Sequence, residues 1–301
     1  MKLGLVGLGR MGASLAGSAM RHGHQIVGYN KNPVCTRELV EQGLEPAFSL
    51  AELVQKLAPP RLVLIYVPHG DAVNATVAEL NGLMQAGDVV GDGGNSHWKD
   101  SVRHCQALKA NGIDFLDVGT SGGVDGARSG ACFMVGGDAA AFGRALPLLR
   151  DLAVPEGVLH AGPAGAGHFV KLIHNAIEFG MVQAMGEGLD LLARSDYALD
   201  LPALFHNWAN GSVIRGWLVE LMERGLREHR LEELSSRVED TREVKWALQY
   251  ALDKEAWVPV IAAAELAFYR YRDSDSTAGK GVALLRHGFG GHPLGKKSDR
   301  G

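Results

Sequence analysis

The chain has few cysteines, and they stand far apart. Cys35, Cys105 and Cys132 are the three among 301 residues, and their spacing fits neither a zinc site nor a redox pair. A small, odd number of thiols is typical of a reducing compartment. We therefore expect a cytoplasmic protein whose cysteines stay reduced, with no bound metal.

Long apolar runs are also missing. No window reaches the roughly 18 consecutive apolar residues that a membrane span needs. Glycines at positions 7, 9 and 12 interrupt the apolar start of the chain, too early for a signal peptide. We expect neither a membrane segment nor a signal sequence.

The chain has no strong charge of either sign. Its formal net charge is −4, which gives no electrostatic reason to bind nucleic acid or an anionic membrane surface. The 40 glycines show no repeat period, which excludes collagen-like and low-complexity sequence. With 46% apolar residues in 301, the length suits two globular domains.

What the chain does have is a series of short apolar runs at helical intervals. Residues 2–6 and 25–29 flank an alanine-rich helical segment, and further runs occupy residues 62–67, 89–90, 113–116 and 132–135. Strands separated by helices predict an α/β domain with a Rossmann-type, doubly wound, mostly parallel sheet. From about residue 166 helical patterns take over. We predict a dinucleotide-binding domain over residues 1–165 and an all-α substrate and dimerisation domain over 166–301.

A glycine-rich turn links the first strand to the first helix. It reads G-x-G-x-x-G and comprises Gly7, Leu8, Gly9, Arg10, Met11 and Gly12. Glycine permits a tight turn and close backbone approach, and the helix start offers unpaired N–H groups to a pyrophosphate. Placed between a strand and a helix, the motif predicts a site for a nicotinamide dinucleotide.

The residues after the second strand bear on the choice of dinucleotide. A carboxylate there would bind the ribose 2′-hydroxyl of NAD, and a basic residue suits the 2′-phosphate of NADP. The sequence has Asn30 and Lys31, with no acid before Glu38. This favours NADP and leaves NAD open. Val67, at the end of a later strand, is a further expected cofactor contact.

Two glycine-rich segments, residues 91–96 and 119–128, follow predicted strands. Their glycines let a ligand touch the backbone, and Asn95 and Ser121 add neutral hydrogen-bonding groups. Such turns are common without function. Their joint position at strand ends favours a binding site that includes Asn95, Ser121, Gly122 and Gly123.

The segment 167–178 carries the clearest catalytic signal. Its polar side chains have the spacing i, i+3, i+4, i+7, and they are Lys171, His174, Asn175 and Glu178. On a helix, this spacing places all four within an arc of roughly 100°. A lysine, an amide and a carboxylate on one face could move protons to and from a substrate, and they would pack poorly in a core.

The remaining helical segments look structural. Residues 220–243 mix Arg and Glu as a solvated helix does. Residues 259–272 predict a helix that buries Ala262, Leu266 and Tyr269 and places Arg270 near its end. A glycine-rich, basic tail follows at 286–292.

Taken together, these motifs resemble the decarboxylating 6-phosphogluconate dehydrogenases, in their short single-repeat form, within the β-hydroxyacid dehydrogenase superfamily. The resemblance covers nearly the whole chain. It includes the glycine-rich start, residues 91–96, the Ser121-Gly122-Gly123 loop, the 167–178 helix and a tail of the form Arg286-x-x-Phe-Gly-Gly-His292.

The resemblance implies an oxidative decarboxylation of 6-phosphogluconate in the pentose phosphate pathway. Lys171 would act as the general base on the 3-hydroxyl while hydride leaves C3, which requires a neutral amine and so a lowered pKa. Protonated Lys171 would then stabilise the enolate left by loss of CO2. Glu178 would protonate C1 to release ribulose 5-phosphate.

The resemblance also implies how the substrate is held. His174, Asn175 and Asn95 would bind its hydroxyls, and Ser121, Gly122 and Gly123 its carboxylate. Arg270 would meet the phosphate. Arg286 and His292 would reach that phosphate from a neighbouring subunit, which predicts a homodimer or a dimer-based tetramer whose tails complete each other's sites.

Two departures from the family pattern bear on the substrate. Phe179 stands where the family usually has a phosphate-binding tyrosine, and residues 241–247 replace a glycine-rich stretch, with Arg242 and Lys245 as candidate substitutes. Two other readings stay open. One is a dehydrogenase for an unphosphorylated hydroxy acid such as 3-hydroxyisobutyrate, without loss of CO2. The other is a non-catalytic dinucleotide-binding module.

Overall fold

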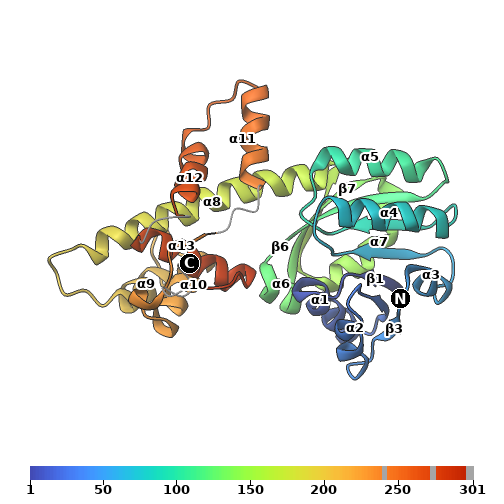
Figure 1. Ribbon diagram of the computed structural model, residues 1–301, viewed down its shortest axis with the longest axis horizontal. Helices are drawn as coiled ribbons and strands as arrows, with labels where there is room; N and C mark the ends of the chain where they lie inside the picture. The colour runs from blue at the N-terminus through green and yellow to red at the C-terminus, as the bar shows by residue number, and fades with distance from the viewer. Residues whose placement is uncertain (239–242, 272–275, 296–301) are drawn as a thin grey trace. The chain divides into compact units, whose positions relative to one another are not determined.

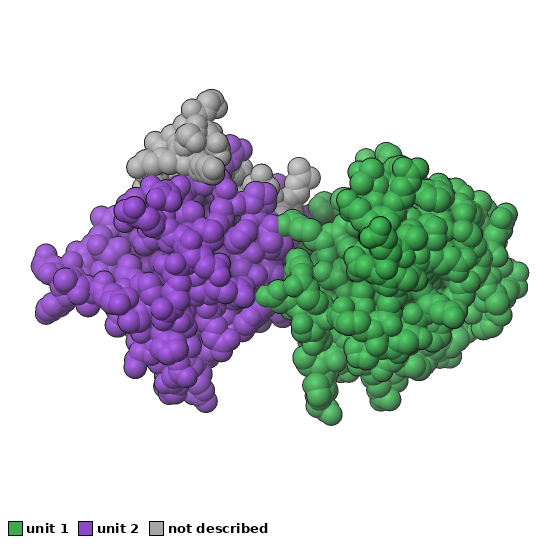
Figure 2. All heavy atoms as spheres, turned by 90° about the horizontal axis from the view of Figure 1, so that it is seen from below, with its two compact units in different colours: residues 1–171 green, residues 172–301 purple. Residues whose placement is uncertain are grey.

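The computed structural model describes residues 1–238, 243–271 and 276–295. The chain divides into two compact units, residues 1–171 and 172–301, which Figure 2 shows in different colours. The division falls inside helix α8 (Ala166–Ala193), which begins where the predicted second domain starts. No helix in the described ranges is long and apolar enough to cross a membrane.

The first unit is built on one eight-stranded sheet with the order β3-β2-β1-β4-β5-β6-β7-β8. The β6–β7 pair is antiparallel, and the other neighbours are parallel. The predicted Rossmann-type, mostly parallel fold is confirmed. The strands are β1 (Lys2–Val6), β2 (Gln25–Tyr29), β3 (Glu45–Ala47), β4 (Leu62–Ile65), β5 (Val89–Asp92), β6 (Asp114–Ser121), β7 (Ala131–Gly137) and β8 (Ala153–Gly162).

Helices cover both faces of this sheet (Figure 1). Alternate residues of a strand point to opposite faces, so Leu62 and Leu64 join one apolar core while Val63 and Ile65 join the other. The first core includes α1 (Arg10–Arg21) and α7 (Ala139–Leu152). The second includes α3 (Leu50–Gln55), α4 (Asp71–Leu83) and α5 (Trp98–Lys109). Burial on both faces explains why the central strands are continuous apolar runs.

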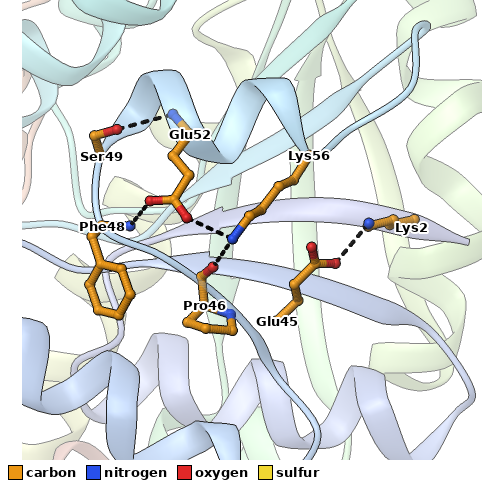
Figure 3. Close-up of polar contacts among 7 residues, drawn as sticks. All are labelled: Lys2, Glu45, Pro46, Phe48, Ser49, Glu52 and Lys56. Carbon is orange, nitrogen blue, oxygen red and sulfur yellow. Dashed lines mark hydrogen bonds and ion pairs between the residues drawn. The ribbon is translucent and has the colours of Figure 1, made fainter.

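Strand β3 lies at the edge of the sheet, and polar contacts join its residues and the following turn to α3 (Figure 3). Ser49 caps α3 by accepting the Glu52 N–H at 3.0 Å, and Glu52 in turn accepts the Phe48 N–H at 2.8 Å. Lys56 donates to Glu52 and to the carbonyl of Pro46, at 2.7 and 2.6 Å. This reciprocal capping fixes where the edge strand ends and α3 begins.

The second unit is helical. After α8 it contains α9 (Leu201–Ala209), α10 (Trp217–Glu228), the short 3₁₀ helix η1 (Leu231–Glu233), α11 (Glu243–Asp253), α12 (Pro259–Arg270) and α13 (Thr277–Gly290). Its core gathers Phe179, Phe205, Met222, Phe268 and Leu285 from five helices. The predicted all-α second domain is confirmed. Charged side chains on α10 form the expected i, i+4 contact, with Arg227 2.9 Å from Glu223.

Two expectations for this unit are wrong in detail. The buried face of α12 is formed by Ala264, Glu265 and Phe268, whereas Leu266 is 64% exposed and Tyr269 is also exposed. The buried face differs from the expected one because apolar residues occur on more than one side of this helix, and their positions alone do not show which side is buried. The tail does not begin at residue 286, since α13 continues to Gly290.

Candidate active site

The glycine-rich turn packs tightly against its surroundings at two of its three glycines. Gly7 has a φ of +92°, and a Cβ there would overlap the carbonyl of Tyr66. A Cβ on Gly12 would overlap the carbonyl of Gly7. These two positions therefore need glycine for the fold of the turn itself.

Gly9 is different. A Cβ on Gly9 would meet no atom within 4 Å. Gly9 is the N-cap of α1, has no side chain to cap it, and no acidic residue follows in the first turn. Open space beside uncapped N–H groups at a helix N-terminus suits a pyrophosphate, so the residues present fit a dinucleotide.

The side chain of Asn30 stabilises this turn. Its Oδ1 accepts the Leu8 N–H at 2.9 Å, and its Nδ2 donates to the Asn32 carbonyl at 3.1 Å. Leu8 itself is buried in the core, so only its backbone borders the turn. Lys31 and Arg10 are exposed and Met11 is half-buried. Of the two residues expected to select the cofactor, Lys31 is the more accessible.

The loop after β5 is shaped by Asp92, which the sequence alone did not single out. This fully buried carboxylate accepts the Gly94 N–H at 2.9 Å and the Ser96 hydroxyl at 2.6 Å. Asn95 lies between them and is exposed. The carbonyl of Val67 lies 3.0 Å from the Cβ position of Gly94, so the ends of β4 and β5 meet at this loop.

Tyr66 is a second residue that sequence patterns did not identify. A Cβ on Gly93 would overlap its ring, and its hydroxyl lies 3.1 Å from that of Thr120. Burial raises the pKa of Tyr66 to about 12, so the phenol stays protonated at neutral pH. Because Tyr66 joins the ends of β4, β5 and β6, it supports the edge of the sheet that carries both predicted binding loops.

The other predicted loop follows β6. Ser121 ends the strand, and Gly122 and Gly123 turn the chain into α6 (Gly123–Ser129) with φ values of +115° and +60°. Positive φ explains the glycines. All three residues are half-buried, so the loop borders the surface at the carboxyl end of the strand.

Helix α8 carries the predicted proton-transfer groups. Lys171 and Asn175 are 8% and 7% exposed. His174 lies one residue away, with its Nδ1 3.1 Å from Asn175 Oδ1 and 3.8 Å from a Glu178 carboxylate oxygen. Their helical spacing places a base, an amide and an acid along one face.

Lys171 also packs closely on strand β6. A Cβ on Gly119 would lie 2.7 Å from Lys171 Cβ and 2.9 Å from the Gly167 carbonyl. Glycine at 119 therefore lets the helix lie against the strand at the position of the lysine. Gly119 lies two residues before Ser121, the last residue of β6.

The predicted phosphate-binding residues of the second unit lie in different surroundings. Arg270 is exposed at the end of α12. Arg286 is only 3% exposed, and its guanidinium carbon lies 5.3 and 5.6 Å from the ring centroids of Phe179 and Phe268. The half-buried His292 follows α13, and its carbonyl lies 2.7 Å from His287 Nδ1. The structure thus brings Arg286 together with Phe179.

The segment that departs from the family pattern is partly described. Thr241 and Arg242 lie outside the described residues, and Lys245 is exposed on α11. Within the described ranges, no group of three or more His, Cys, Asp or Glu side chains could hold a metal ion.

The Rossmann-type sheet, the glycine turn with its uncapped helix and the helical second unit define an NAD(P)-binding oxidoreductase. Family models agree. Residues 2–162 match the NAD-binding domain of 6-phosphogluconate dehydrogenase, and residues 167–283 match the C-terminal domain of that enzyme. The chain belongs to the 6-phosphogluconate dehydrogenase family.

Two relatives match along their whole length. The chain is 44% identical to the Bacillus subtilis protein named "Putative 6-phosphogluconate dehydrogenase YqeC", covering 99% of this chain and 100% of that protein. It is 39% identical to the NAD(+)-dependent, decarboxylating 6-phosphogluconate dehydrogenase of Haloferax volcanii, with the same coverage.

Solved structures show the same fold. Plasmodium falciparum 6-phosphogluconate dehydrogenase, described with its cofactor NADP+ and its substrate, matches with a TM-score of 0.83 and 26% identity, over 90% of this chain and 62% of that one. A 3-hydroxyisobutyrate dehydrogenase from Salmonella typhimurium matches with a TM-score of 0.78 and 22% identity, over 94% of this chain and 99% of that one. The latter likeness concerns the fold alone.

Proposed function

We propose that the chain catalyses oxidative decarboxylation of 6-phosphogluconate to ribulose 5-phosphate and CO2, with NADP or NAD as hydride acceptor. The observation that carries the proposal is the face of α8 on which Lys171 and Asn175 are buried and His174 lies near Glu178. The names of the relatives at 44% and 39% identity support it.

The proposed roles follow from chemistry at named atoms. A bound nicotinamide dinucleotide would supply the acceptor for the hydride that leaves C3 of the substrate. The Lys171 amine removes the proton of the 3-hydroxyl, and burial shields it from the water that would stabilise an ammonium. Once protonated, Lys171 donates a hydrogen bond to the oxygen on which negative charge develops as CO2 leaves.

Glu178 completes the cycle in this proposal. Seven residues after Lys171, it lies two turns further along the same face of the helix, so both side chains can face one bound substrate. It donates a proton to C1 of the enediol. His174, whose Nδ1 is 3.8 Å from the Glu178 carboxylate, orients that group, and Asn175 binds a hydroxyl.

We propose the glycine turn, Asn30, Lys31, Val67 and Asn95 as the dinucleotide contacts. The exposed Lys31 suits a 2′-phosphate, which favours NADP. The Haloferax relative is named as NAD(+)-dependent, and the Plasmodium structure is described with NADP+. Because of Lys31, we propose NADP as the preferred acceptor and NAD as the second.

We also propose a homodimer in the cytoplasm. Large apolar side chains are exposed on α11, on α12 and on the loop between them; they are Leu252, Trp257, Val260 and Leu266. Exposed apolar clusters commonly mark protein interfaces. Light scattering at micromolar concentration should give twice the mass of the chain, and a monomeric mass would contradict this part of the proposal.

A second candidate is oxidation of an unphosphorylated hydroxy acid. One observation favours it: Phe179 has no hydroxyl to offer a phosphate, and its ring lies 4.6 Å from that of Phe268, centroid to centroid. A phosphorylated substrate would therefore have one hydrogen-bond donor fewer for its phosphate, and Arg270 and Arg286 would have to supply the rest, whereas an unphosphorylated acid would need none of them.

The assay follows nicotinamide reduction by absorbance with 6-phosphogluconate and with a panel of unphosphorylated hydroxy acids, and CO2 release is measured in parallel. Equimolar CO2 and reduced dinucleotide from 6-phosphogluconate support the main proposal. Reduction without CO2, on an unphosphorylated acid alone, supports the second candidate. Binding of a dinucleotide with no turnover of any acid contradicts both and fits a binding module.

A further inference from the structure

A buried carboxylate ties the start of α8 to the sheet. Asp117 on β6 is fully buried. One of its oxygens accepts the Gly165 N–H and the other accepts the His168 N–H, both at 2.7 Å. Gly165 directly precedes α8 and His168 lies in its first turn, where N–H groups lack partners within the helix. Carboxylates bind such groups strongly.

The same turn is held by a second tether. The His168 Nδ1 lies 2.7 Å from the Ser101 hydroxyl on α5, and both side chains are buried. Asp117 therefore binds the backbone of His168 while Ser101 contacts its ring. Two contacts from different elements restrict both sliding and rotation of the helix at this point.

Three glycines make the close contact possible. A Cβ on Gly136 would lie 2.5 Å from an Asp117 carboxylate oxygen and 2.7 Å from the Gly167 nitrogen. A Cβ on Gly167 would lie 2.6 Å from the Gly136 nitrogen. Gly119 meets Lys171 Cβ in the same way. The backbones of β6, β7 and α8 thus approach without intervening side chains.

The order of residues along β6 shows how Asp117 can determine the position of Lys171. Asp117, Gly119 and Ser121 are each two residues apart on β6, so they share one face of the strand at intervals of about 7 Å. Asp117 binds the turn at His168, and Gly119 meets Lys171, one helical turn of about 5 Å further on. Where Asp117 holds the helix therefore decides where Lys171 stands beside Gly119.

We propose that Asp117 is a positioning residue for Lys171. It sets the axial and rotational register of α8 on β6, and through that register it places the lysine amine against the bound substrate. The proposal rests on the proposed function in one respect, because it assigns Lys171 to the reaction. The proposal goes beyond that function because it gives a role to Asp117, a residue that would touch neither substrate nor cofactor.

The direct test is Asp117→Asn. An amide has one acceptor oxygen, so it can accept one of the two N–H groups and must turn its NH2 toward the other. We expect kcat to fall about 10- to 100-fold, because small misplacement of a reacting group is costly. The KM and the dinucleotide Kd should change less than about threefold.

The matched control is Asp88→Asn. Asp88 is also fully buried in the first unit and accepts backbone N–H groups, from Arg61 at 2.7 Å and from Gln85 at 3.0 Å, but it lies away from α8. Loss of this carboxylate should lower stability and leave the kcat of folded enzyme within about twofold of the wild type. Equal losses of kcat in the two variants would overturn the proposal.

A second variant covers the case in which Asp117→Asn does not fold. Gly119→Ala leaves Asp117 intact and pushes against Lys171 Cβ, so kcat should fall with little change in dinucleotide Kd. Unchanged kcat in this variant would mean that the register of α8 does not matter to the lysine, and the proposal would fail.

Amide hydrogen exchange gives a readout that needs no substrate. Exchange of residues 165–171 should be faster in Asp117→Asn than in Asp88→Asn, and equal rates would contradict the tether. The kinetic comparison uses whichever acid the wild type oxidises. Failure of 6-phosphogluconate as substrate would therefore contradict the proposed function without deciding the role of Asp117.

Discussion

Asp92 on β5 and Asp117 on β6 are direct neighbours in the parallel register, and both are fully buried. Asp92 folds the loop that carries Asn95, and Asp117 ties down the helix that carries Lys171. One row of the sheet therefore fixes a predicted binding loop and a predicted catalytic helix. Each carboxylate offsets the cost of its burial with two hydrogen bonds from the segment that it organises.

The glycine turn allows a matched pair of substitutions. Gly9→Ala adds a methyl group in open space, so the melting temperature should stay within about 2 °C. The dinucleotide Kd should rise about tenfold or more, because the methyl group occupies the space proposed for the pyrophosphate. Calorimetry measures the melting temperature, and fluorescence titration measures the dinucleotide Kd. An unchanged Kd would place the dinucleotide elsewhere.

Gly12→Ala is the complementary change. Its methyl group would overlap the Gly7 carbonyl, and overpacking of this kind costs about 1–3 kcal/mol. The free energy of unfolding should fall by that amount in urea denaturation. If Gly12→Ala is as stable as Gly9→Ala, a methyl group at position 12 does not collide with the Gly7 carbonyl, and the inference of a tightly packed turn fails.

Lys171→Met removes the proposed base while keeping an unbranched side chain that is one atom shorter. General-base catalysis contributes about 10²- to 10⁴-fold, so kcat should fall by a factor in that range while the dinucleotide Kd stays near normal. Steady-state kinetics and titration measure the two quantities. Lys109→Met, on an exposed lysine of the same unit, should keep full activity. A Lys171→Met enzyme with more than a few percent of wild-type kcat would exclude the lysine.

The sequence predicted the central strands well and the edge strands poorly. Strands β4 and β5 are buried on both faces, so they appear as apolar runs. Strand β3 has three residues and includes Pro46, and β8 lies at the other edge with Val154 and Leu159 exposed. Edge strands need not be apolar and tolerate proline, so neither gave a recognisable signal.

The candidate site was predictable where it depends on local spacing. The glycine turn and the α8 stripe are short-range patterns, and both occur on the elements predicted for them. Asp117 and Tyr66 act through contacts between segments far apart in the chain. Asp92 binds residues of its own loop, but a single buried residue has no period to reveal it. Arg286 was expected in a glycine-rich tail, but it lies on α13 and is buried beside Phe179 and Phe268.

Lys31 should decide the preference between the two dinucleotides. Lys31→Ala removes a charge that only the 2′-phosphate of NADP can use, and a charged hydrogen bond contributes about 1.5–3 kcal/mol. The Kd for NADP should therefore rise about 10-fold or more, while the Kd for NAD provides the internal control and stays unchanged. Parallel titrations test this. Equal changes for both dinucleotides would show that Lys31 does not contact the phosphate.

His104 should make stability depend on pH on the acidic side of neutrality. It is buried on α5 and lies against Phe115, with ring centroids 5.9 Å apart. Its Nε2 donates to Asn74 Oδ1 at 2.8 Å, and in the part of the chain that the structure describes its Nδ1 has no hydrogen-bond partner. Burial lowers the pKa of His104 below its usual value, because a proton on Nδ1 would be buried without an acceptor.

A lowered pKa in the folded state means that the unfolded chain binds the proton first. As the pH falls through about 6.5, the usual value for histidine, the free energy of unfolding should decrease, by up to about 1.4 kcal/mol per pH unit, until the folded pKa is reached. His104→Gln keeps a donor for Asn74 and cannot titrate, so urea denaturation between pH 7.5 and about pH 5 should show a shallower decrease in the variant. The lowered pKa of His97 acts equally in both proteins and cancels in the comparison. Identical pH dependence in the two proteins would show that His104 is protonated as readily in the folded state as in the unfolded chain.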